Sequence, residues 1–412
     1  MDDMSLVPKL RFKKNDGSDF PNWIKKKFND IYSFFHTNSY PRSLLDTHYG
    51  YVKNIHYGDI HTKLKSHCDV ATEKIPYLNK EVDISKIKDT DYCMEGDLII
   101  ADASEDYKDI GKTIEITNLN QEKIVAGLHT YIARDLKKGM ALGFGAYMMQ
   151  TYKIRQQMMI LSTGISVLSI SKSNLSKLEI HIPSIEEQEK IAGFLTAVDE
   201  LIADLTKKES LLQKYKKGVM QKIFSQELRF KQDDGSDYPD WKEKKLEALT
   251  VICTGKSNRE DSVATGGAFT FFDRSQDIRT SSKYLFDCEA VIVPGEGQDF
   301  IPKYFHGKFD LHQRTYAILK SDEKKANNLN FRFLYYFIFV SKNYFLSQAV
   351  GSTVKSLRLP LFKNLNVSVP CLEEQQKIAN FLSSIDDQIS IVQKQLDKTK
   401  QYKKALLQQL FI

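Results

Sequence analysis

Four histidines and a cysteine near the N-terminus are the first residues whose types and spacing suggest chemistry. His48, His56, His61, His67 and Cys68 lie within one short stretch of the chain. Imidazole nitrogens and thiolates are preferred zinc ligands. However, the spacings match no common ligand pattern, and the second half of the chain has no equivalent group. The sequence therefore favours structural histidines over a metal site.

The glycine-rich segments do not form a nucleotide-binding loop. GFGAYM at 143–148 and GEGQDF at 295–300 each contain G-x-G but lack the third glycine of a dinucleotide fingerprint. The G-x-x-x-x-G-K-[ST] motif that cradles ATP phosphates is absent from the sequence. We therefore expect this chain to bind no nucleotide cofactor and to encode no motor.

Catalytic constellations are also weak. Pro239, Asp240, Glu243 and Lys245 imitate the carboxylate set of a nuclease, but the matching segment around Asn22 does not repeat it. A solvated helix start is the simpler interpretation. The sequence contains no methyl-donor fingerprint and no Asp/Asn-Pro-Pro-aromatic tetrad for a flipped base. We therefore expect a chain without catalytic residues and without a bound metal.

Polar side chains on predicted turns could instead meet the edges of nucleic-acid bases. Arginine and lysine suit guanine, whereas asparagine and glutamine suit adenine. For any one residue, a solvated surface position is the simpler alternative. The candidate base-contacting residues are Lys53, Asn54, His56, Lys63, Arg134 and Arg155 in the first half of the chain, and Lys256, Asn258, Arg259, Arg274, Gln276, Arg279, Gln298, Gln313, Arg314 and Lys355 in the second.

Two segments that must frame these residues occur twice. LRFKKNDGSDFPNW at 10–23 returns as LRFKQDDGSDYPDW at 228–241, and IPSIEEQEKIAGFL at 182–195 matches VPCLEEQQKIANFL at 369–382. The first pair is offset by 218 residues and the second by 187, so the interval between the repeated segments is 31 residues shorter in the second copy. The chain is therefore two copies of one unit with similar ends. The variable middles are about 24–163 and 242–350.

Each copy ends in a long predicted helix. No proline occurs from Glu186 to Phe224, and apolar residues recur at every seventh position, as in a coiled coil. Ser184 with Glu187 predicts a capping box, whereas Cys371 in the matching place caps less well. Each helix would be roughly 60 Å long, so we expect the two to pack together, with packing on their own domains as the alternative. The residues expected in helix and partner packing are Ile191, Phe194, Leu195, Val198, Leu201, Ile202, Leu205, Leu212, Tyr215, Ile378, Phe381, Leu382, Ile385, Ile389, Val392, Leu396, Tyr402 and Leu406.

Strand-like runs dominate both middles. These runs are rich in β-branched and aromatic residues and are bounded by Gly, Asp, Asn or Pro. The segments 330–348 and about 140–158 instead indicate buried helices. We therefore expect mixed α/β domains. The predicted strands are GDLIIADA at 96–103, KTIEITNL at 112–119, HTYIARDL at 129–136, SVLSI at 166–170, AVIVPGEG at 290–297 and RTYAILK at 314–320.

Composition adds limits but no function. The 412 residues are 42% hydrophobic and 27% charged, which is typical of two or three globular domains. The five scattered cysteines suit a reducing compartment. The apolar run Phe333–Val340 is too short to span a membrane, and Met1–Lys14 is too charged for a signal peptide, so we expect a cytoplasmic protein. The net charge of +6 does not by itself indicate nucleic-acid binding.

This arrangement resembles the specificity subunit of type I restriction-modification enzymes. The resemblance covers the whole chain: two variable domains are each followed by a proline, a Glu-Gln-rich helix start and a heptad helix. Its most specific parts are IPSIEEQEKIAGFLTAVD and VPCLEEQQKIANFLSSID, which resemble the two conserved regions of that family. The W-x-x-K-K-[FL] segments resemble the usual lead-in to a recognition domain.

The resemblance implies a DNA-reading protein with an α/β fold and a pseudo-twofold internal repeat. Each target recognition domain would read one half of a bipartite, asymmetric site, and two antiparallel coiled-coil helices would set the spacer. The implied domains are recognition domains at 1–183 and 228–370 and long helices at 184–227 and 371–412.

The resemblance also implies partners. They are double-stranded DNA, two modification subunits that methylate adenine with S-adenosylmethionine, and restriction subunits that use ATP and Mg²⁺. This chain itself would be non-catalytic, because a separate enzyme can transfer the methyl group to a flipped base while the reader holds register. The alternative from another class is a two-domain coiled-coil scaffold that binds only proteins.

Overall fold

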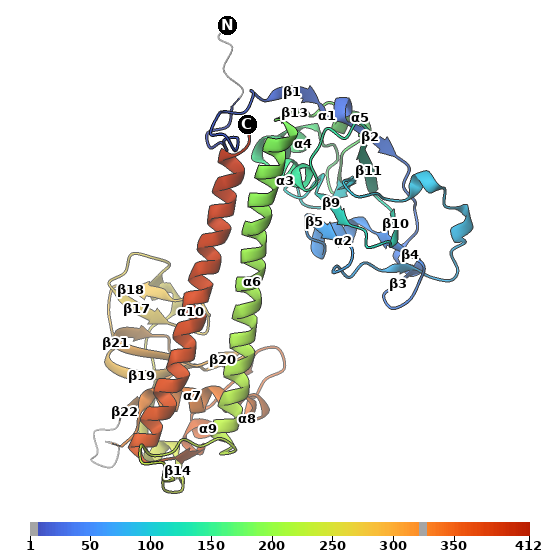
Figure 1. Ribbon diagram of the computed structural model, residues 1–412. Coiled ribbons are helices and arrows are strands. Elements are labelled where there is room, and N and C mark those ends of the chain that lie inside the picture. The colour runs from blue at the N-terminus through green and yellow to red at the C-terminus, as the bar shows by residue number, and fades with distance from the viewer. Residues whose placement is uncertain (1–6, 321–327) are drawn as a thin grey trace. The chain divides into compact units, whose positions relative to one another are not determined.

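A computed structural model describes residues 7–320 and 328–412 (Figure 1). Residues 1–6 and 321–327 fall in the two predicted recognition domains but lie outside the described part. The chain forms two compact units. Unit 1 contains the residues up to Leu205 together with Gln395–Ile412, and unit 2 contains Thr206–Lys394. Each unit therefore combines one globular lobe with parts of both long helices.

The lobe of unit 1 is a mixture of strands and short helices, as its sequence predicted. The helix α6 starts directly after it. The elements are β1 Ile24–Lys27, α1 Phe28–Ile31, β2 Tyr32–Phe35, η1 Arg42–Leu44, β3 Leu45–Asp46, β4 Val52–Ile55, α2 Tyr57–Thr62, β5 His67–Asp69, β6 Tyr77–Leu78, η2 Ile84–Lys86, η3 Asp89–Asp91, β7 Leu98–Ala101, β8 Ala103–Ser104, β9 Thr113–Asn118, β10 Lys123–Ala126, β11 Thr130–Asp135, α3 Phe144–Gln150, α4 Tyr152–Leu161, β12 Leu168–Ser169, α5 Lys172–Ser176, β13 Glu179–Ile182 and α6 Ile185–Phe224.

The lobe of unit 2 has the same mixed character, and its predicted buried helix is the pair α7 and α8. The helix α10 follows it. The elements are β14 Lys242–Lys245, η4 Leu246–Ala248, β15 Thr250–Thr254, η5 Arg259–Asp261, β16 Ser262–Val263, β17 Phe269–Phe272, β18 Arg279–Ser281, β19 Phe286–Pro294, β20 Glu296–Gly297, β21 Lys303–Leu311, β22 Thr315–Lys320, α7 Phe331–Val340, α8 Lys342–Gln348, β23 Lys355–Ser356, α9 Leu359–Lys363, β24 Asn366–Val369 and α10 Leu372–Gln409.

Each lobe contains its own sheet of the same topology, although the sequences of the lobes differ. We call this common arrangement the shared sheet. The strand order is β2-β11-β7-β9-β5 in unit 1 and β15-β22-β19-β21-β17 within the larger sheet of unit 2. In both, the first three neighbouring pairs are antiparallel and the last pair is parallel. The sheets differ at one edge, where β18 and β16 extend the sheet of unit 2. In unit 1, a separate four-stranded sheet (β10-β4-β6-β3) lies beside the shared one.

The central strands explain why the same sheet forms twice. Leu98–Ala101 in unit 1 is buried at every position, and Ala290–Pro294 in unit 2 is buried in the same way. Continuous runs of aliphatic residues are typical of strands covered on both faces. Different sequences can therefore satisfy one topology, because burial on both faces constrains only apolar character and size.

Each lobe packs on the ends of both long helices that fall within its unit. In unit 1, Trp23 contacts Phe144 and Phe411 edge-on, so the end of α10 closes the lobe core. In unit 2, Trp241 contacts Phe224 and Phe333 edge-on, and Phe224 also packs against Phe333, so the end of α6 closes that core. The lead-in strands add a second tie, because β1 pairs with β13 and β14 pairs with β24.

The start of each long helix is fixed by an ion pair, which corrects the predicted capping box. Ser184 Oγ is buried without a hydrogen-bond partner. The buried Glu187 carboxylate instead accepts hydrogen bonds from the Arg11 guanidinium at 2.9 and 3.0 Å. Arg229 makes the same bidentate contact with Glu374. The repeated L-R-F segment therefore supplies an arginine that neutralises a buried carboxylate in the first turn of the helix.

Ion pairs between the helices also repeat. In unit 1, Lys403 of α10 binds Asp199 of α6 at 2.6 Å, and Tyr147 of the lobe donates to the same carboxylate. In unit 2, Lys216 of α6 binds Asp386 of α10, which accepts from Tyr336. Each pair links two helices and a lobe.

The predicted packing residues divide into buried and exposed groups. Leu201, Tyr215 and Tyr402 are about half exposed and lie outside the buried seam. The predicted packing residues that are buried are Ile191, Leu195, Val198, Ile378, Leu382, Ile385, Val392, Leu396 and Leu406. Those that are partly buried are Phe194, Ile202, Leu205, Leu212, Phe381 and Ile389.

No helix in the described residues is long and apolar enough to cross a membrane.

Candidate nucleic-acid interface

In unit 2, four chain segments meet beyond the strand ends of the shared sheet. Gly295 N donates to Arg314 O at 2.9 Å, which joins the end of β19 to the start of β22. His312 N donates to Phe272 O at 2.9 Å, and Gln313 N donates to Ser257 O at 2.9 Å. These backbone bonds hold the segments after β15, β17, β19 and β21 in one place.

A buried carboxylate anchors this meeting point. Asp310 accepts hydrogen bonds from Ser257 Oγ at 2.8 and 2.9 Å and from Ser281 Oγ at 3.1 Å. It also accepts from Leu311 N at 2.9 Å. Loop segments built on such a rigid base present their side chains in defined positions.

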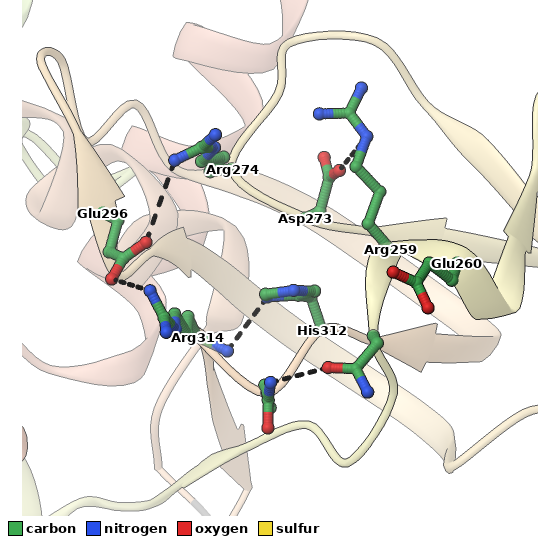
Figure 2. Close-up of a pocket in the computed structure, with 9 residues that line it drawn as sticks. Arg259, Glu260, Asp273, Arg274, Glu296, His312 and Arg314 are labelled. Carbon is green, nitrogen blue, oxygen red and sulfur yellow. Dashed lines mark hydrogen bonds and ion pairs between the residues drawn. The ribbon is translucent and has the colours of Figure 1, made fainter.

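The four segments surround a hollow of about 420 Å³. Figure 2 shows that Arg259, Arg274, Glu296 and Arg314 project around His312. Five of its lining residues were predicted from sequence, and the acidic residues and the histidine were not. We call this hollow the Arg314 corner, and it is lined by Asn258, Arg259, Glu260, Asp273, Arg274, Glu296, His312, Gln313 and Arg314.

Every arginine of the Arg314 corner has a carboxylate beside it. Arg314 Nη1 lies 2.8 Å and Arg274 Nη1 lies 3.9 Å from Glu296, and Arg259 Nε lies 3.7 Å from Asp273. The three arginine side chains remain more than half exposed. Ion pairs whose arginine is that exposed to solvent contribute little to stability, about 0–1 kcal/mol each. Their main effect is to orient the guanidinium groups.

His312 lies between these groups and is oriented by the backbone. Its Nδ1 accepts a hydrogen bond from Arg314 N at 3.1 Å, which leaves Nε2 as the donor nitrogen in the neutral ring. Burial and, less strongly, the nearby Arg314 lower the pKa of His312, while Asp273 opposes this shift. The ring is therefore a neutral donor at physiological pH.

The remaining predicted residues of unit 2 lie around or outside this corner. Gln313 Nε2 donates to Asn258 Oδ1 at 2.6 Å, and Lys355 lies on β23, which pairs with β20 beside Glu296. Arg279 donates to Ser262 Oγ at 2.7 Å within the sheet. The others, Lys256, Gln276 and Gln298, are exposed.

The predicted residues of unit 1 are mostly used by the fold itself. Arg134 is buried and donates to both Asp97 oxygens at 2.6 and 2.7 Å. Lys53 is buried, with its ammonium 3.3 Å from Val70 O and from Glu122. Asn54 is fully buried and accepts from Asn38. The geometry therefore favours structural roles for these three residues.

Three further predicted residues of unit 1 also have partners: His56 is buried, Arg155 is partly buried and Lys63 is exposed. His56 caps α2 by accepting from Gly58 N at 3.2 Å, and burial is the largest cause that lowers its pKa. Lys63 pairs with Asp59 at 2.9 Å, and Arg155 donates to Lys108 O at 2.6 Å. The structure does not bring these six residues together at one place.

The position in unit 1 that corresponds to the Arg314 corner carries residues that were not predicted. His129 precedes β11 as Arg314 precedes β22, and its Nδ1 lies 3.1 Å from Asp102. The Tyr57 ring meets His129 edge-on, with ring centroids 5.3 Å apart. The matching strand starts H-T-Y at 129–131 and R-T-Y at 314–316 were the signal in the sequence. We call Tyr57, Asp102, Ala103 and His129 the His129 corner.

The histidine group considered first as a metal site does not converge. The His48 side chain is almost fully exposed, whereas His61 Nε2 contacts Ala103 O and His67 Nε2 contacts Gly143 O. Within residues 7–320 and 328–412, no group of three or more His, Cys, Asp or Glu could hold a metal ion. The histidines of this segment serve local hydrogen bonding.

The sequence matches the type I restriction modification DNA specificity domain over residues 22–213 and again over 238–401. The chain belongs to this family. The two matches coincide with the two copies that the internal repeat defines. The resemblance seen in the paired Glu-Gln-rich helix starts is thereby confirmed.

Curated relatives and solved structures agree with this assignment. The putative MjaX specificity subunit of Methanocaldococcus jannaschii is 24% identical, with 96% of this chain and 94% of the relative covered. The MjaVIII specificity subunit of the same organism is 26% identical over 63% of this chain and 68% of the relative. A solved S subunit from M. genitalium shares the fold at a TM-score of 0.62 and 16% identity, covering 98% of this chain and 99% of that one.

Proposed function

We propose that this specificity subunit reads a bipartite, asymmetric DNA site, one half with each unit. One observation carries the proposal. The same five-stranded arrangement occurs once in each unit. The exposed corner beyond its strand ends carries different polar side chains in the two copies. A shared scaffold with exchanged side chains suits two unlike half-sites, because base identity is read by side chains at groove edges.

The long helices would hold the two readers at a set distance. The cross-helix ion pairs at Asp199 and Asp386 support this role, since each fixes one helix against the other within its unit. A constant distance between two readers corresponds to a constant non-specific spacer between half-sites.

The chemistry would belong to other subunits. Two modification subunits would methylate adenine with S-adenosylmethionine, and restriction subunits would use ATP and Mg²⁺, while this chain stays non-catalytic. The modest net charge of +6 supports shared DNA binding, because phosphate contacts require many cations that the modification subunits can supply. The assembly would work in the cytoplasm, where its DNA substrate is found.

The direct test is recognition by the assembled complex. Single-molecule sequencing of DNA from cells with and without this chain should show methylated adenines in one bipartite motif that depends on the chain. Titration of the purified complex with cognate and scrambled duplexes should show preference for the cognate duplex. Equal affinity for both at every salt concentration would contradict DNA reading and leave the protein-binding scaffold.

A further inference from the structure

We propose that the residue before the Thr-Tyr pair of the shared sheet sets base identity in each unit: Arg314 in unit 2 and His129 in unit 1. The proposal deepens the proposed function and rests on it. Arg314 would read a guanine, and His129 would read a base that offers an exocyclic amine, adenine or cytosine.

The backbone places these two residues at equivalent points. Gly295 N donates to Arg314 O at 2.9 Å in unit 2, and Asp102 N donates to His129 O at 3.1 Å in unit 1. The next bond also repeats: Leu357 N donates to Gly295 O as Ile170 N donates to Asp102 O. The correspondence therefore rests on hydrogen bonding, although the two middles share little sequence.

A small antiparallel pairing completes the match. Ser169 pairs with Ala103 in unit 1, and Ser356 pairs with Glu296 in unit 2. Ala103 and Glu296 are thus equivalent positions. Glu296 supplies the carboxylate that binds Arg314, whereas the equivalent residue of unit 1, Ala103, has none. In unit 1 the carboxylate beside His129 comes from the preceding residue, Asp102.

Both side chains are accessible and held in place. The side chain of Arg314 is 62% exposed and that of His129 is 50% exposed. His129 also has a backbone φ of 55°, in the left-handed region that costs energy for residues other than glycine. Such strain persists where the surrounding structure imposes it, and it is concentrated at functional sites.

The charge pattern at the Arg314 corner favours bases over phosphates. Glu260, Asp273 and Glu296 balance the three arginines of the corner. A phosphate would meet these carboxylates as well as the cations, whereas a base edge carries no net charge. An arginine held by a carboxylate also presents its planar fork with less loss of side-chain freedom on binding. A bidentate fork matches the O6 and N7 acceptors of guanine.

The His129 corner suits a different base. The neutral tautomer that donates Nδ1–H to Asp102 leaves Nε2 as an acceptor. In the major groove, the donors available to an acceptor are the amines of adenine and cytosine. The edge-on contact with Tyr57 fixes the plane of the ring. The two corners therefore differ in hydrogen-bond polarity, as two unlike half-sites require.

The experiment uses the full methyltransferase complex assembled with variants of this chain. Arg314→Ala and His129→Ala remove the proposed readers, and Glu296→Gln keeps the size of the buttress but removes its charge. The matched controls are Lys308→Ala, which removes a cation of unit 2 outside the corner, and His48→Ala, which removes an exposed imidazole of unit 1. Each complex is bound to a duplex library randomised in both half-sites, and the bound sequences are determined.

For Arg314→Ala we expect discrimination to collapse at one position of one half-site, a position that is G·C for the unsubstituted chain. The loss should be roughly 5- to 150-fold, the usual value of one bidentate base contact. Glu296→Gln should weaken preference at that same position. His129→Ala should relax one position of the other half-site, an A·T or G·C pair read through its amine. The controls should leave the motif unchanged.

Other results would overturn the inference. Relaxation at an A·T pair for Arg314→Ala, or in one and the same half-site for both variants, would contradict the assignment. An equal loss of affinity for all sequences would indicate phosphate contacts instead. The proposed function fails separately, namely if the unsubstituted complex selects no motif at all. A selected motif that none of the variants alters would refute only this inference.

Discussion

At the residue scale, residue type alone did not distinguish an exposed candidate arginine from a structural one. Both Arg134 and Arg314 were predicted to contact bases, and the structure places Arg134 within β11 and Arg314 directly before β22. In the structure, Arg134 neutralises Asp97, whose side chain is 1% exposed. The side chain of Arg314 is 62% exposed and binds the partly buried Glu296 at the rim of a hollow. Burial, which depends on distant chain segments, separates the two roles.

This difference predicts opposite effects on stability. Arg134→Ala leaves the buried Asp97 without its partner, and breaking a buried pair typically costs about 3–5 kcal/mol. Arg314→Ala removes a side chain that is 62% exposed and leaves Arg274 near Glu296, so it should change the free energy of unfolding by less than about 1 kcal/mol. Denaturant unfolding of the purified protein measures both. Similar losses for the two variants would show that Asp97 is not the buried anchor described here.

A second residue links stability to pH. Burial raises the pKa of Glu115 to about 7 from 4.5, while hydrogen bonds from Gly143 N and Ala146 N oppose the rise. Its protonated form is therefore favoured by folding. This contribution to stability is present in full below about pH 4.5 and is lost as the pH rises through 7. At 1.36 kcal/mol per pKa unit, the loss is about 3 kcal/mol.

We expect Glu115→Gln to remove this pH dependence. Between pH 5 and 8, the stability of unit 1 should fall in the unsubstituted protein and stay more nearly level in the variant. Thermal unfolding followed across this range gives the comparison. Glu122→Gln serves as a control because Glu122 is only partly buried. An unchanged slope in Glu115→Gln would show that the carboxyl group does not titrate in this window.

At the element scale, the glycines of the helices and those of the loops have different purposes. Gly193 lies in α6, and a Cβ added there meets nothing within 4 Å. Gly164 has a φ of +125°, and a Cβ there would lie 2.1 Å from Val167 O. Gly351 repeats this geometry in unit 2. The loop glycines permit the tight turns that place β12 and β23 beside the two corners.

Alanine substitutions should therefore act in opposite directions. Gly193→Ala should stabilise the protein by about 0.5–1 kcal/mol, because alanine has the higher helix propensity and no clash arises. Gly164→Ala should destabilise it by more than that amount, because neither the backbone angle nor the space permits a side chain. The melting temperatures of the two variants report the signs. Stabilisation by Gly164→Ala would contradict the described turn.

At the scale of the whole molecule, the two long helices that are proposed to set the spacer can be lengthened. Four residues inserted after Leu205 and four after Val392 would add roughly 6 Å of helix, about two base pairs of DNA. We expect the spacer of the recognised motif to lengthen by about that amount while both half-sites stay the same. Methylation mapping in cells gives the motif.

The single insertions are the control for this prediction. Four extra residues in only one helix shift its heptad seam against an unchanged partner, so the complex should lose activity or stability instead of gaining a longer spacer. An altered half-site in the double insertion would show that the helices do more than set distance.

The two-copy organisation with two long helices could be predicted from the amino-acid sequence. Repeated segments revealed two copies, and heptads revealed two long helices. The β-branched runs predicted β7, β9 and β11 in unit 1 and β19 and β22 in unit 2, but not the other strands of the shared sheet. These features are carried by local periodicity and by self-similarity, which can be read without coordinates. The family resemblance followed from the same paired motifs and was confirmed.

The positions of the proposed base-reading residues could not be predicted from the sequence, because they depend on contacts between distant segments. Arg11 takes the place of the capping box expected at Ser184, and Arg229 makes the equivalent contact in the second copy. In each case a contact over more than a hundred residues neutralises the carboxylate at the helix start. His129 emerged as the counterpart of Arg314 because hydrogen bonds between distant strands define equivalence where sequence does not. Burial and strand pairing are long-range properties, so residue type and spacing along the chain cannot specify which polar groups stay exposed.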